Sequence, residues 1–273
     1  MTFESSNYAK FTHFRVTPVT PGVVHVEFNR PKVINSFGPT TWDQYGALFH
    51  ALDKDDSVRC IVLSGRGPHF CSGLNLKETF PALMGMKDPN NTTFVDKFQE
   101  DINAPVIISK PVISVSHGYT IGLGLDIISA TTIRLCTKDA KFSIKEIDIG
   151  IIADIGSLQR VSVLVGNSSK VNEMALTGDA ISGDEAKELG LVSGVYETKN
   201  DAIQRAYKLA GKIAVKYVPA VEGTKKHLEL MNTNSELVKS GLKSVSIDNT
   251  ALICDDKYKK FFGGFMKKMK AKL

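Results

Sequence analysis

The spacing of apolar residues along this chain alternates between the two-residue period of a strand and the 3.6-residue period of a helix. Two short alternating runs, residues 11–17 and 22–28, are divided by Pro18, Pro21 and Gly22 and predict a β-hairpin. A helix is predicted next, because the following apolar residues share one helical face: Trp42, Tyr45, Leu48, Phe49 and Leu52.

Short strands and helices continue to alternate up to about residue 198. Apolar runs predict strands at residues 60–63, 112–116, 133–136 and 191–196. Helical patterns lie at residues 122–130, 184–189 and, with a break near residues 88–91, 76–110. This alternation predicts an α/β fold in which strands and helices stack in layers.

The chain beyond residue 198 has no clear strand signal. Its first apolar residues have helical spacing: Ile203, Ala206, Leu209, Ala210, Ile213 and Ala214. We therefore divide the chain into a core, residues 1–198, and a helical C-terminal region, residues 199–273. The apolar stripe of such a region must cover either its own core or a neighbouring subunit, so the stripe is compatible with an oligomer.

The composition is ordinary for a folded protein, with 42% hydrophobic and 23% charged residues among 273. The four cysteines are widely spaced and form no CxxC or Cys/His cluster, so we expect reduced thiols and no metal site. The start of the chain has no secretory pattern, and no run reaches the ~18 apolar residues of a membrane span. The net charge of +5 comes without an aromatic or arginine-rich groove pattern, so no nucleic-acid partner is expected.

The last three residues resemble a targeting signal of a known type, although a lysine-rich helix could also end in this way by chance. Ala271-Lys272-Leu273 is a close variant of the Ser-Lys-Leu tripeptide that is read as a peroxisomal address. The sequence therefore predicts a peroxisomal protein that binds the import receptor through this tripeptide.

Two glycine-containing turns each join a strand to the start of a helix. Residues 69–76 read HFCSGLNL and residues 117–126 read HGYTIGLGLD. Each turn leaves free backbone N–H groups at a helix N-terminus, where an oxyanion can be held, although either turn alone can be an ordinary connection. The second lacks the third glycine of a dinucleotide-binding fingerprint. Cys71 and Ser72 have no His/Asp partner pattern for covalent catalysis, and His117 is interpreted as structural.

Three carboxylates lie in apolar sequence surroundings: Asp126, Glu146 and Asp154. Surface pairing is the usual role of such residues, but residues 151–156 have few other surface markers. We therefore predict a functional role for Glu146 and Asp154. Asp148 would share the face of Glu146 if the segment were extended, and we assign it a structural role.

These pieces together resemble the crotonase, or enoyl-CoA hydratase/isomerase, superfamily over nearly the whole chain. The resemblance rests on Asn29-Arg30-Pro31-Lys32 with Asn35, FCSGLNL at 70–76, HGYTIGLGLD at 117–126 and KEIDIGIIADIGSLQR at 145–160. It implies a core of ββα units wound into a spiral, followed by a helical region that builds homotrimers, often paired into hexamers. It also implies an acyl-CoA thioester substrate and no cofactor.

The resemblance assigns a role to the two glycine turns. The thioester oxygen would lie between the backbone N–H groups of Leu74 and Leu123, with Ser72, Gly73 and Gly122 binding the substrate. Leu123 departs from the glycine that is usual in hydratases, but its main-chain donor is the same.

The three carboxylates narrow the resemblance to a subfamily. The two glutamates with which hydratases activate water correspond to Asp126 and Glu146. Hydratases have a small residue at the position of Asp154, and the full pattern is most similar to the Δ3,5-Δ2,4-dienoyl-CoA isomerases. Enoyl-CoA hydratase and Δ3,Δ2-enoyl-CoA isomerase are the alternative activities, and a non-catalytic acyl-CoA-binding protein is a third possibility.

The implied reaction gives each acid a task. Glu146 would remove the C2 proton of a 3,5-dienoyl-CoA, Asp154 would protonate C6, and Asp126 would orient or tune the pair. The acyl chain would contact Phe80, Met84, Met86 and Phe94. The C-terminal lysines either form a solvated helix face or contact a CoA phosphate: Lys257, Lys259, Lys260, Lys267, Lys268 and Lys270.

Overall fold

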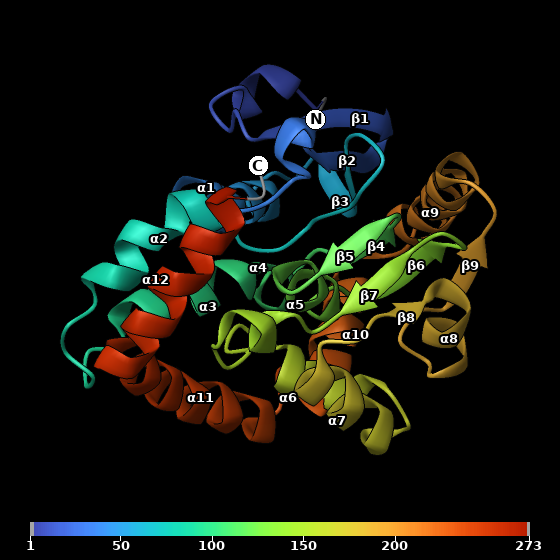
Figure 1. Cartoon of the computed structure of the whole chain (residues 1–273). Coiled ribbons are helices and arrows are strands. Elements are labelled where there is room, and N and C mark those ends of the chain that lie inside the picture. The colour runs from blue at the N-terminus through green and yellow to red at the C-terminus, as the bar shows by residue number, and fades with distance from the viewer. Residues whose placement is uncertain (1–2, 272–273) are drawn as a thin grey trace.

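The computed structural model describes residues 3–271 and contains two β-sheets with helices packed around them (Figure 1). The larger sheet has the strand order β1-β2-β3-β4-β6-β9, with an antiparallel β1–β2 pair and parallel pairing between the other neighbours. Its strands are β1 (Phe14–Thr20), β2 (Gly22–Phe28), β3 (Val58–Gly65), β4 (Val112–Ser116), β6 (Ile133–Thr137) and β9 (Gly194–Tyr196). The smaller sheet contains β5 (Tyr119–Ile121), β7 (Lys141–Ser143) and β8 (Ile181–Ser182).

The predicted hairpin is confirmed as β1 and β2, although β1 runs on to Thr20. Pro18 lies inside this strand, and the pairing register shifts between Pro18 and Thr20. Proline is tolerated there because β1 is the edge of the sheet, where one side of the strand has no hydrogen-bonded neighbour.

The central strands are confirmed where they were predicted. Every residue of β4 is buried, and β3 is buried throughout except at Arg59. Parallel strands covered on both faces read as continuous apolar runs, which explains why the sequence alone locates them. The predicted helix is α1 (Pro39–Asp53), and all five of its predicted apolar residues are buried.

Helices and short 3-10 turns connect the strands of the core. Residues 76–110 form α2 (Leu76–Gly85), α3 (Thr93–Ile102) and α4 (Ala104–Ile107). Four further helices follow: α5 (Leu123–Ser129), α6 (Ser157–Leu164), α7 (Ser168–Thr177) and α8 (Gly183–Glu188). Short 3-10 turns are η1 (Ser5–Tyr8), η2 (Pro31–Val33) and η3 (Glu146–Ile149). The helices α6 and α7 and the smaller sheet were not predicted.

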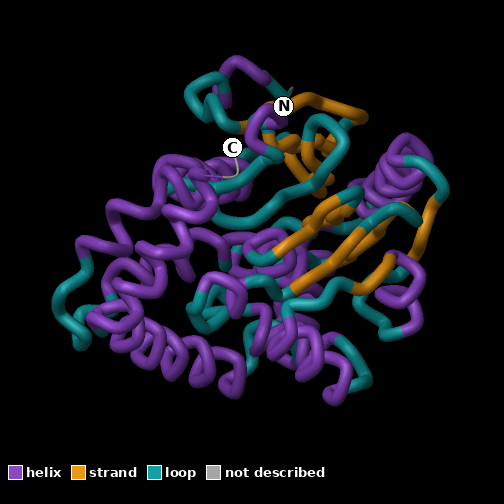
Figure 2. The backbone as a smooth tube through the Cα atoms, viewed as in Figure 1, coloured by secondary structure: helices purple, strands orange, loops and turns teal. Residues whose placement is uncertain are grey.

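The C-terminal region is helical, as predicted. It consists of α9 (Lys199–Ala214), α10 (Val218–Met231), α11 (Glu236–Cys254) and α12 (Asp256–Ala271). Helix α9 packs on the larger sheet, where its buried Ala202, Ala206 and Ala210 contact Val23 and Val62. Helices α11 and α12 turn back beside α2 and α3, on the side of the molecule away from most of the strands (Figure 2). No helix within residues 3–271 is both long and apolar enough to cross a bilayer.

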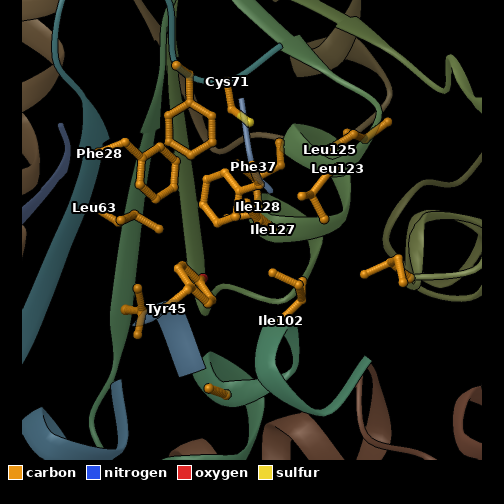
Figure 3. Close-up of a cluster of buried hydrophobic side chains, with 14 of the residues drawn as sticks. Phe28, Phe37, Tyr45, Leu63, Cys71, Ile102, Leu123, Leu125, Ile127 and Ile128 are labelled. Carbon is orange, nitrogen blue, oxygen red and sulfur yellow. The ribbon is translucent and has the colours of Figure 1, made fainter. Parts of the chain in front are cut away.

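The main hydrophobic core fixes the position of α5. Phe28, Phe37 and Tyr45 lie beside Ile127 and Ile128 of this helix (Figure 3). The rings of Phe28 and Phe37 meet edge to face, with their centroids 5.2 Å apart. Each buried side chain of this size contributes roughly 1.5–3 kcal/mol of transfer free energy. The N-terminus of α5, which carries one of the glycine turns, is therefore held by a rigid core.

Candidate active site

The two glycine turns lie side by side in the structure. The N–H of Cys71 donates to the carbonyl oxygen of Tyr119 at 2.9 Å, and the N–H of Ile121 donates to the carbonyl oxygen of Cys71 at 3.0 Å. Gly73 has a φ of +94°, and a Cβ at this position would lie 3.1 Å from the Ile121 oxygen and 3.7 Å from the nitrogen of Leu123. A side chain at Gly73 would therefore strain the backbone and crowd the space between the turns.

Neither the Leu74 N–H nor the Leu123 N–H has a hydrogen-bond acceptor among the described residues. The chain on both sides of Leu74 is fixed, because Phe37 donates to Gly73 and accepts from Asn75. Leu123 is the first residue of α5, where a backbone N–H has no partner within the helix. The two predicted donors are thus free and firmly placed.

The other predicted substrate-binding residues lie in the same turns. Ser72 is half-buried, and its backbone N–H already donates to the carbonyl oxygen of Ile34 at 3.1 Å. Gly122 is buried and has a φ of +54°. A Cβ on Gly122 would lie 2.8 Å from Oε1 of Glu146, so glycine leaves room there for the carboxyl.

Glu146 places its carboxyl beside the start of α5. The 3-10 turn η3 is closed by the Ile151 N–H, which donates to the carbonyl oxygen of Glu146 at 3.2 Å. The carboxyl is buried, and Oε2 has no hydrogen-bond partner among residues 3–271. Burial raises the pKa of Glu146 well above its ordinary value, and the charges of Asp126 and Asp154 raise it further. An unpaired buried carboxyl oxygen of this kind is available to a substrate.

Asp126 lies in the first turn of α5 and is only 1% exposed. Its Oδ1 accepts a hydrogen bond from the N–H of Ser157 at 2.5 Å, which joins α5 to the start of α6. Burial raises the pKa of Asp126 to about 6, while the Ser157 hydrogen bonds and the charge of Arg160 oppose that rise. Asp126 thus supports the loop that carries Asp154.

Asp154 lies in the loop between η3 and α6 and is held by residues that the sequence reasoning did not identify. Nδ2 of Asn249 donates to Oδ2 of Asp154 at 2.6 Å, and Nε2 of Gln99 donates to the Asp154 backbone oxygen at 2.6 Å. Burial raises the pKa of Asp154 to about 7, which the Asn249 hydrogen bond opposes and the charge of Asp126 favours. The structure therefore brings all three predicted acids within electrostatic reach of one another.

Asp148 and Arg160 also lie in residues 145–160, and they differ in burial. Arg160 is fully buried and donates to the Ile155 carbonyl oxygen at 3.0 Å and to Oδ1 of Asn103 at 2.7 Å. Burial lowers its pKa to about 10, against the charge of Asp126. Asp148 is exposed and pairs with Lys145 at 2.8 Å, because the segment is a 3-10 turn rather than a strand.

An apolar cluster borders Asp154. Helix α12 contributes Tyr258, Phe262 and Met266, which pack against Leu83 of α2 and against Ile151. The four residues predicted for the acyl pocket are partly buried around the same cluster: Phe80, Met84, Met86 and Phe94. The Tyr258 hydroxyl is buried without a hydrogen-bond partner among the described residues, and burial and the charge of Asp154 raise its pKa.

The cysteines and acids form no metal site within residues 3–271. Cys60, Cys71 and Cys136 are buried free thiols, and Cys254 is a half-buried one. Burial raises the pKa of Cys71 to about 12, so its thiolate is strongly disfavoured beside the glycine turns.

The buried carboxyl of Asp154 should make stability depend on pH. Its pKa rises from 3.8 to about 7 on folding, so above about pH 4 the folded protein keeps a proton that the unfolded chain releases. The stabilisation by this bound proton is complete below about pH 4. It is lost progressively as the pH rises from about 4 to about 7. Asparagine stays neutral, so the Asp154→Asn variant should gain about 4 kcal/mol in free energy of unfolding, relative to the wild type, as the pH rises from about 4 to about 8. Urea unfolding across this range measures the difference, and parallel pH profiles would contradict it.

This chain is similar in sequence to a known protein family and to several characterised proteins. The profile of the family described as enoyl-CoA hydratase/isomerase matches residues 19–271. The mitochondrial Delta(3,5)-Delta(2,4)-dienoyl-CoA isomerase of Mus musculus is 34% identical over 250 residues, covering 89% of this chain and 76% of that protein. The peroxisomal enzyme of the same name from Arabidopsis thaliana is 36% identical over 242 residues, covering 86% of each chain.

A solved structure has the same fold. The crystal structure of enoyl-CoA hydratase from Bacillus halodurans aligns with a TM-score of 0.81 at 20% identity, covering 92% of this chain and 99% of that one. This similarity confirms the predicted crotonase-like α/β fold. The chain belongs to the enoyl-CoA hydratase/isomerase family of enzymes.

Proposed function

We propose that this enzyme is an isomerase of fatty-acid oxidation that converts a 3,5-dienoyl-CoA into the 2,4-dienoyl-CoA. The observation that carries the proposal is the position of Asp154. This second buried carboxyl is held by Asn249 at the border of an apolar cluster, while the carboxyl of Glu146 lies beside Gly122, the residue that precedes Leu123. Two carboxyls in different surroundings suit a reaction that removes a proton at one carbon and adds one farther along the chain.

The first step needs the two free backbone donors. The thioester oxygen would accept hydrogen bonds from the N–H groups of Leu74 and Leu123. Negative charge develops on this oxygen when the C2 proton leaves, and each such donor is worth on the order of 3 kcal/mol in the transition state. Glu146 would take the C2 proton through its unpaired oxygen Oε2 when it is ionised, and its raised pKa makes that ionised form a stronger base than an ordinary carboxylate.

The second step completes the double-bond shift. Removal of the C2 proton leaves an anion that is delocalised from the thioester oxygen to C6. Protonated Asp154 would deliver its proton to C6, which leaves double bonds at C2–C3 and C4–C5. Glu146 then holds the proton from C2 and Asp154 is ionised, so one proton transfer from Glu146 to Asp154 restores the starting state. Buried Ile151 and Ile155 would keep out water that could add to the product.

Asp126 would set the charge of the pair rather than contact the substrate. The charge of ionised Asp126 raises the pKa of both Glu146 and Asp154. Buried neighbouring carboxyls do not all ionise together, so at neutral pH the cluster keeps at least one proton. The proposed mechanism requires this state, with one acid and one base.

The test is an assay of the purified enzyme with 3,5-dienoyl-CoA and, separately, with 2-enoyl-CoA and 3-enoyl-CoA. The proposal predicts a product with ultraviolet absorbance characteristic of a diene conjugated with the thioester. Water addition to 2-enoyl-CoA without diene isomerisation would identify a hydratase instead. Turnover of 3-enoyl-CoA alone would identify the Δ3,Δ2-isomerase, and CoA binding without any turnover would identify a binding protein.

We also propose that the helical region, residues 199–273, builds a homotrimer or a hexamer. Several large apolar side chains of this region are exposed on the single chain: Val215, Tyr217, Leu228, Leu230, Met231 and Leu237. Exposed apolar groups of this number are typical of a protein interface. Because α9 packs on the sheet of the core, the boundary at residue 198 would separate the two regions in sequence more than in space.

The compartment and the phosphate contacts remain predictions. The two relatives differ in compartment, and we keep the peroxisomal prediction and the import receptor because of Ala271-Lys272-Leu273. Lys272 and Leu273 of this tripeptide lie outside the described residues. Along α12 the lysines lie away from Tyr258, Phe262 and Met266, and all except the half-buried Lys259 are exposed, so they are available to a CoA phosphate.

A further inference from the structure

We propose that Asn249 is a positioning residue that fixes the acidic proton of Asp154 on the oxygen Oδ1. The inference rests on the proposed function, because it assigns to Asp154 the role of proton donor. It concerns a neutral side chain on α11, in a part of the chain far from the glycine turns.

The orientation of the Asn249 amide follows from its other hydrogen bond. Oδ1 of Asn249 accepts the backbone N–H of Ile152 at 3.0 Å. A flipped amide would place its NH₂ group against this N–H, with donor facing donor, and its oxygen against the carboxyl of Asp154. Asn249 is only 1% exposed, so water cannot relieve that conflict. The NH₂ group must therefore face Asp154.

This orientation makes the two oxygens of Asp154 unequal. Oδ2 accepts the Asn249 N–H at 2.6 Å, and a proton on Oδ2 would compete with that short hydrogen bond. The proton of neutral Asp154 therefore belongs on Oδ1. After Asp154 gives up its proton, the same amide N–H stabilises the carboxylate that remains.

No other described side chain donates a hydrogen bond to this carboxyl. The ionisable groups that act on it are Asp126 from α5, Glu146 from η3 and Tyr258 from α12. The charge of Asp126 favours the neutral form of Asp154, and Asp154 in turn raises the pKa of Glu146 and of Tyr258, whose hydroxyl has no hydrogen-bond partner among the described residues. Asn249 is the one described side chain that supplies a donor favouring the ionised form, and the backbone N–H of Asp154 itself acts in the same direction.

A purely structural role for Asn249 predicts different behaviour, and Gln99 provides the matched control. Gln99 also ties the Asp154 loop to α11, because its Nε2 donates to the backbone oxygens of Asp154 at 2.6 Å and Leu242 at 3.0 Å. Unlike Asn249, it does not bond to the Asp154 carboxyl. Gln99→Leu loosens the same loop and leaves the hydrogen bond to Oδ2 in place.

The experiment compares Asn249→Leu and Gln99→Leu with the wild type in two measurements. The first is an infrared titration of the substrate-free protein, in which the protonated-carboxyl band of Asp154 is assigned by its absence in Asp154→Asn. We expect the Asp154 pKa to rise by about one unit in Asn249→Leu, because the donor to the ionised form is lost, and to stay unchanged in Gln99→Leu.

The second measurement is the pH dependence of kcat with 3,5-dienoyl-CoA. The alkaline limb should move to higher pH in Asn249→Leu only, with kcat at least about 10-fold lower and KM within about two-fold of the wild-type value.

Each outcome decides one of the two hypotheses. An unchanged Asp154 pKa in Asn249→Leu, or equal shifts in both variants, would overturn the role of Asn249. A wild-type enzyme that does not isomerise dienes, combined with the expected infrared shift, would overturn the proposed function and leave the positioning of Asp154 intact. If Asn249→Leu does not fold, Asn249→Ser tests the same point, because serine is too short to reach the carboxyl and the same shift is expected.

Discussion

The Asp154→Asn enzyme is expected to isomerise 3,5-dienoyl-CoA about 1,000-fold more slowly than the wild type. An amide has no proton to give to C6, whereas its carbonyl oxygen can still accept the hydrogen bond from Asn249. The fold should therefore persist, and substrate binding should change little. Stopped-flow absorbance of the conjugated product gives the rate, and KM within about three-fold of wild type would separate a loss of chemistry from a loss of binding.

The same variant should still exchange the C2 protons with solvent. Glu146 and the two backbone donors are untouched, so the first proton transfer remains possible when the second is blocked. In deuterium oxide, Asp154→Asn should yield 3,5-dienoyl-CoA labelled at C2, visible by NMR, with little 2,4-product. Normal diene turnover in this variant would exclude Asp154 as the acid.

The sequence located the elements whose burial is uniform along the chain. Strands such as β4 are covered on both faces and read as continuous apolar runs, so their boundaries follow from composition. The strands of the smaller sheet have only three, three and two residues, which is too short to show a period of two. They exist because the glycine turns place them next to one another, and that placement is a tertiary effect.

The residues of the candidate site also fall into two groups, those that the sequence reveals and those that only the fold reveals. The acids and the glycine turns are visible in the sequence because charge in an apolar segment and glycine before a helix are local signals. Asn249 and Gln99 are not, because they meet Asp154 across 95 and 55 positions of the chain. The burial of Arg160 could not be predicted either, because arginine is usually exposed and only the fold shows that this one is fully buried near Asp126. A polar residue at a buried helix position, as Asn249 is, would have been the signal to follow.

The second large effect is expected for Glu146→Gln, which should abolish both product formation and C2 exchange, each by about 1,000-fold or more. Glutamine keeps the size of the side chain beside Gly122 but cannot accept the C2 proton. Asp148→Asn is the matched control, because it removes a carboxylate from the same 3-10 turn at an exposed surface pair. That pair contributes at most about 1 kcal/mol to stability, and the control should keep its activity within about two-fold.

The two acid variants together test the order of the proton transfers. If Glu146 acts first, the Glu146→Gln enzyme does not form the anion that Asp154 protonates. Replacing Asp154 as well should then cause no further loss of rate. The double variant Glu146→Gln/Asp154→Asn should then isomerise the diene no more slowly than Glu146→Gln alone, within about two-fold, because residues that serve successive steps are not additive. Deuterium at C2 in Asp154→Asn but not in Glu146→Gln would place the base at the thioester end and the acid at C6. The reverse labelling would exchange their roles, because the residue that abstracts the C2 proton must be present for exchange to occur.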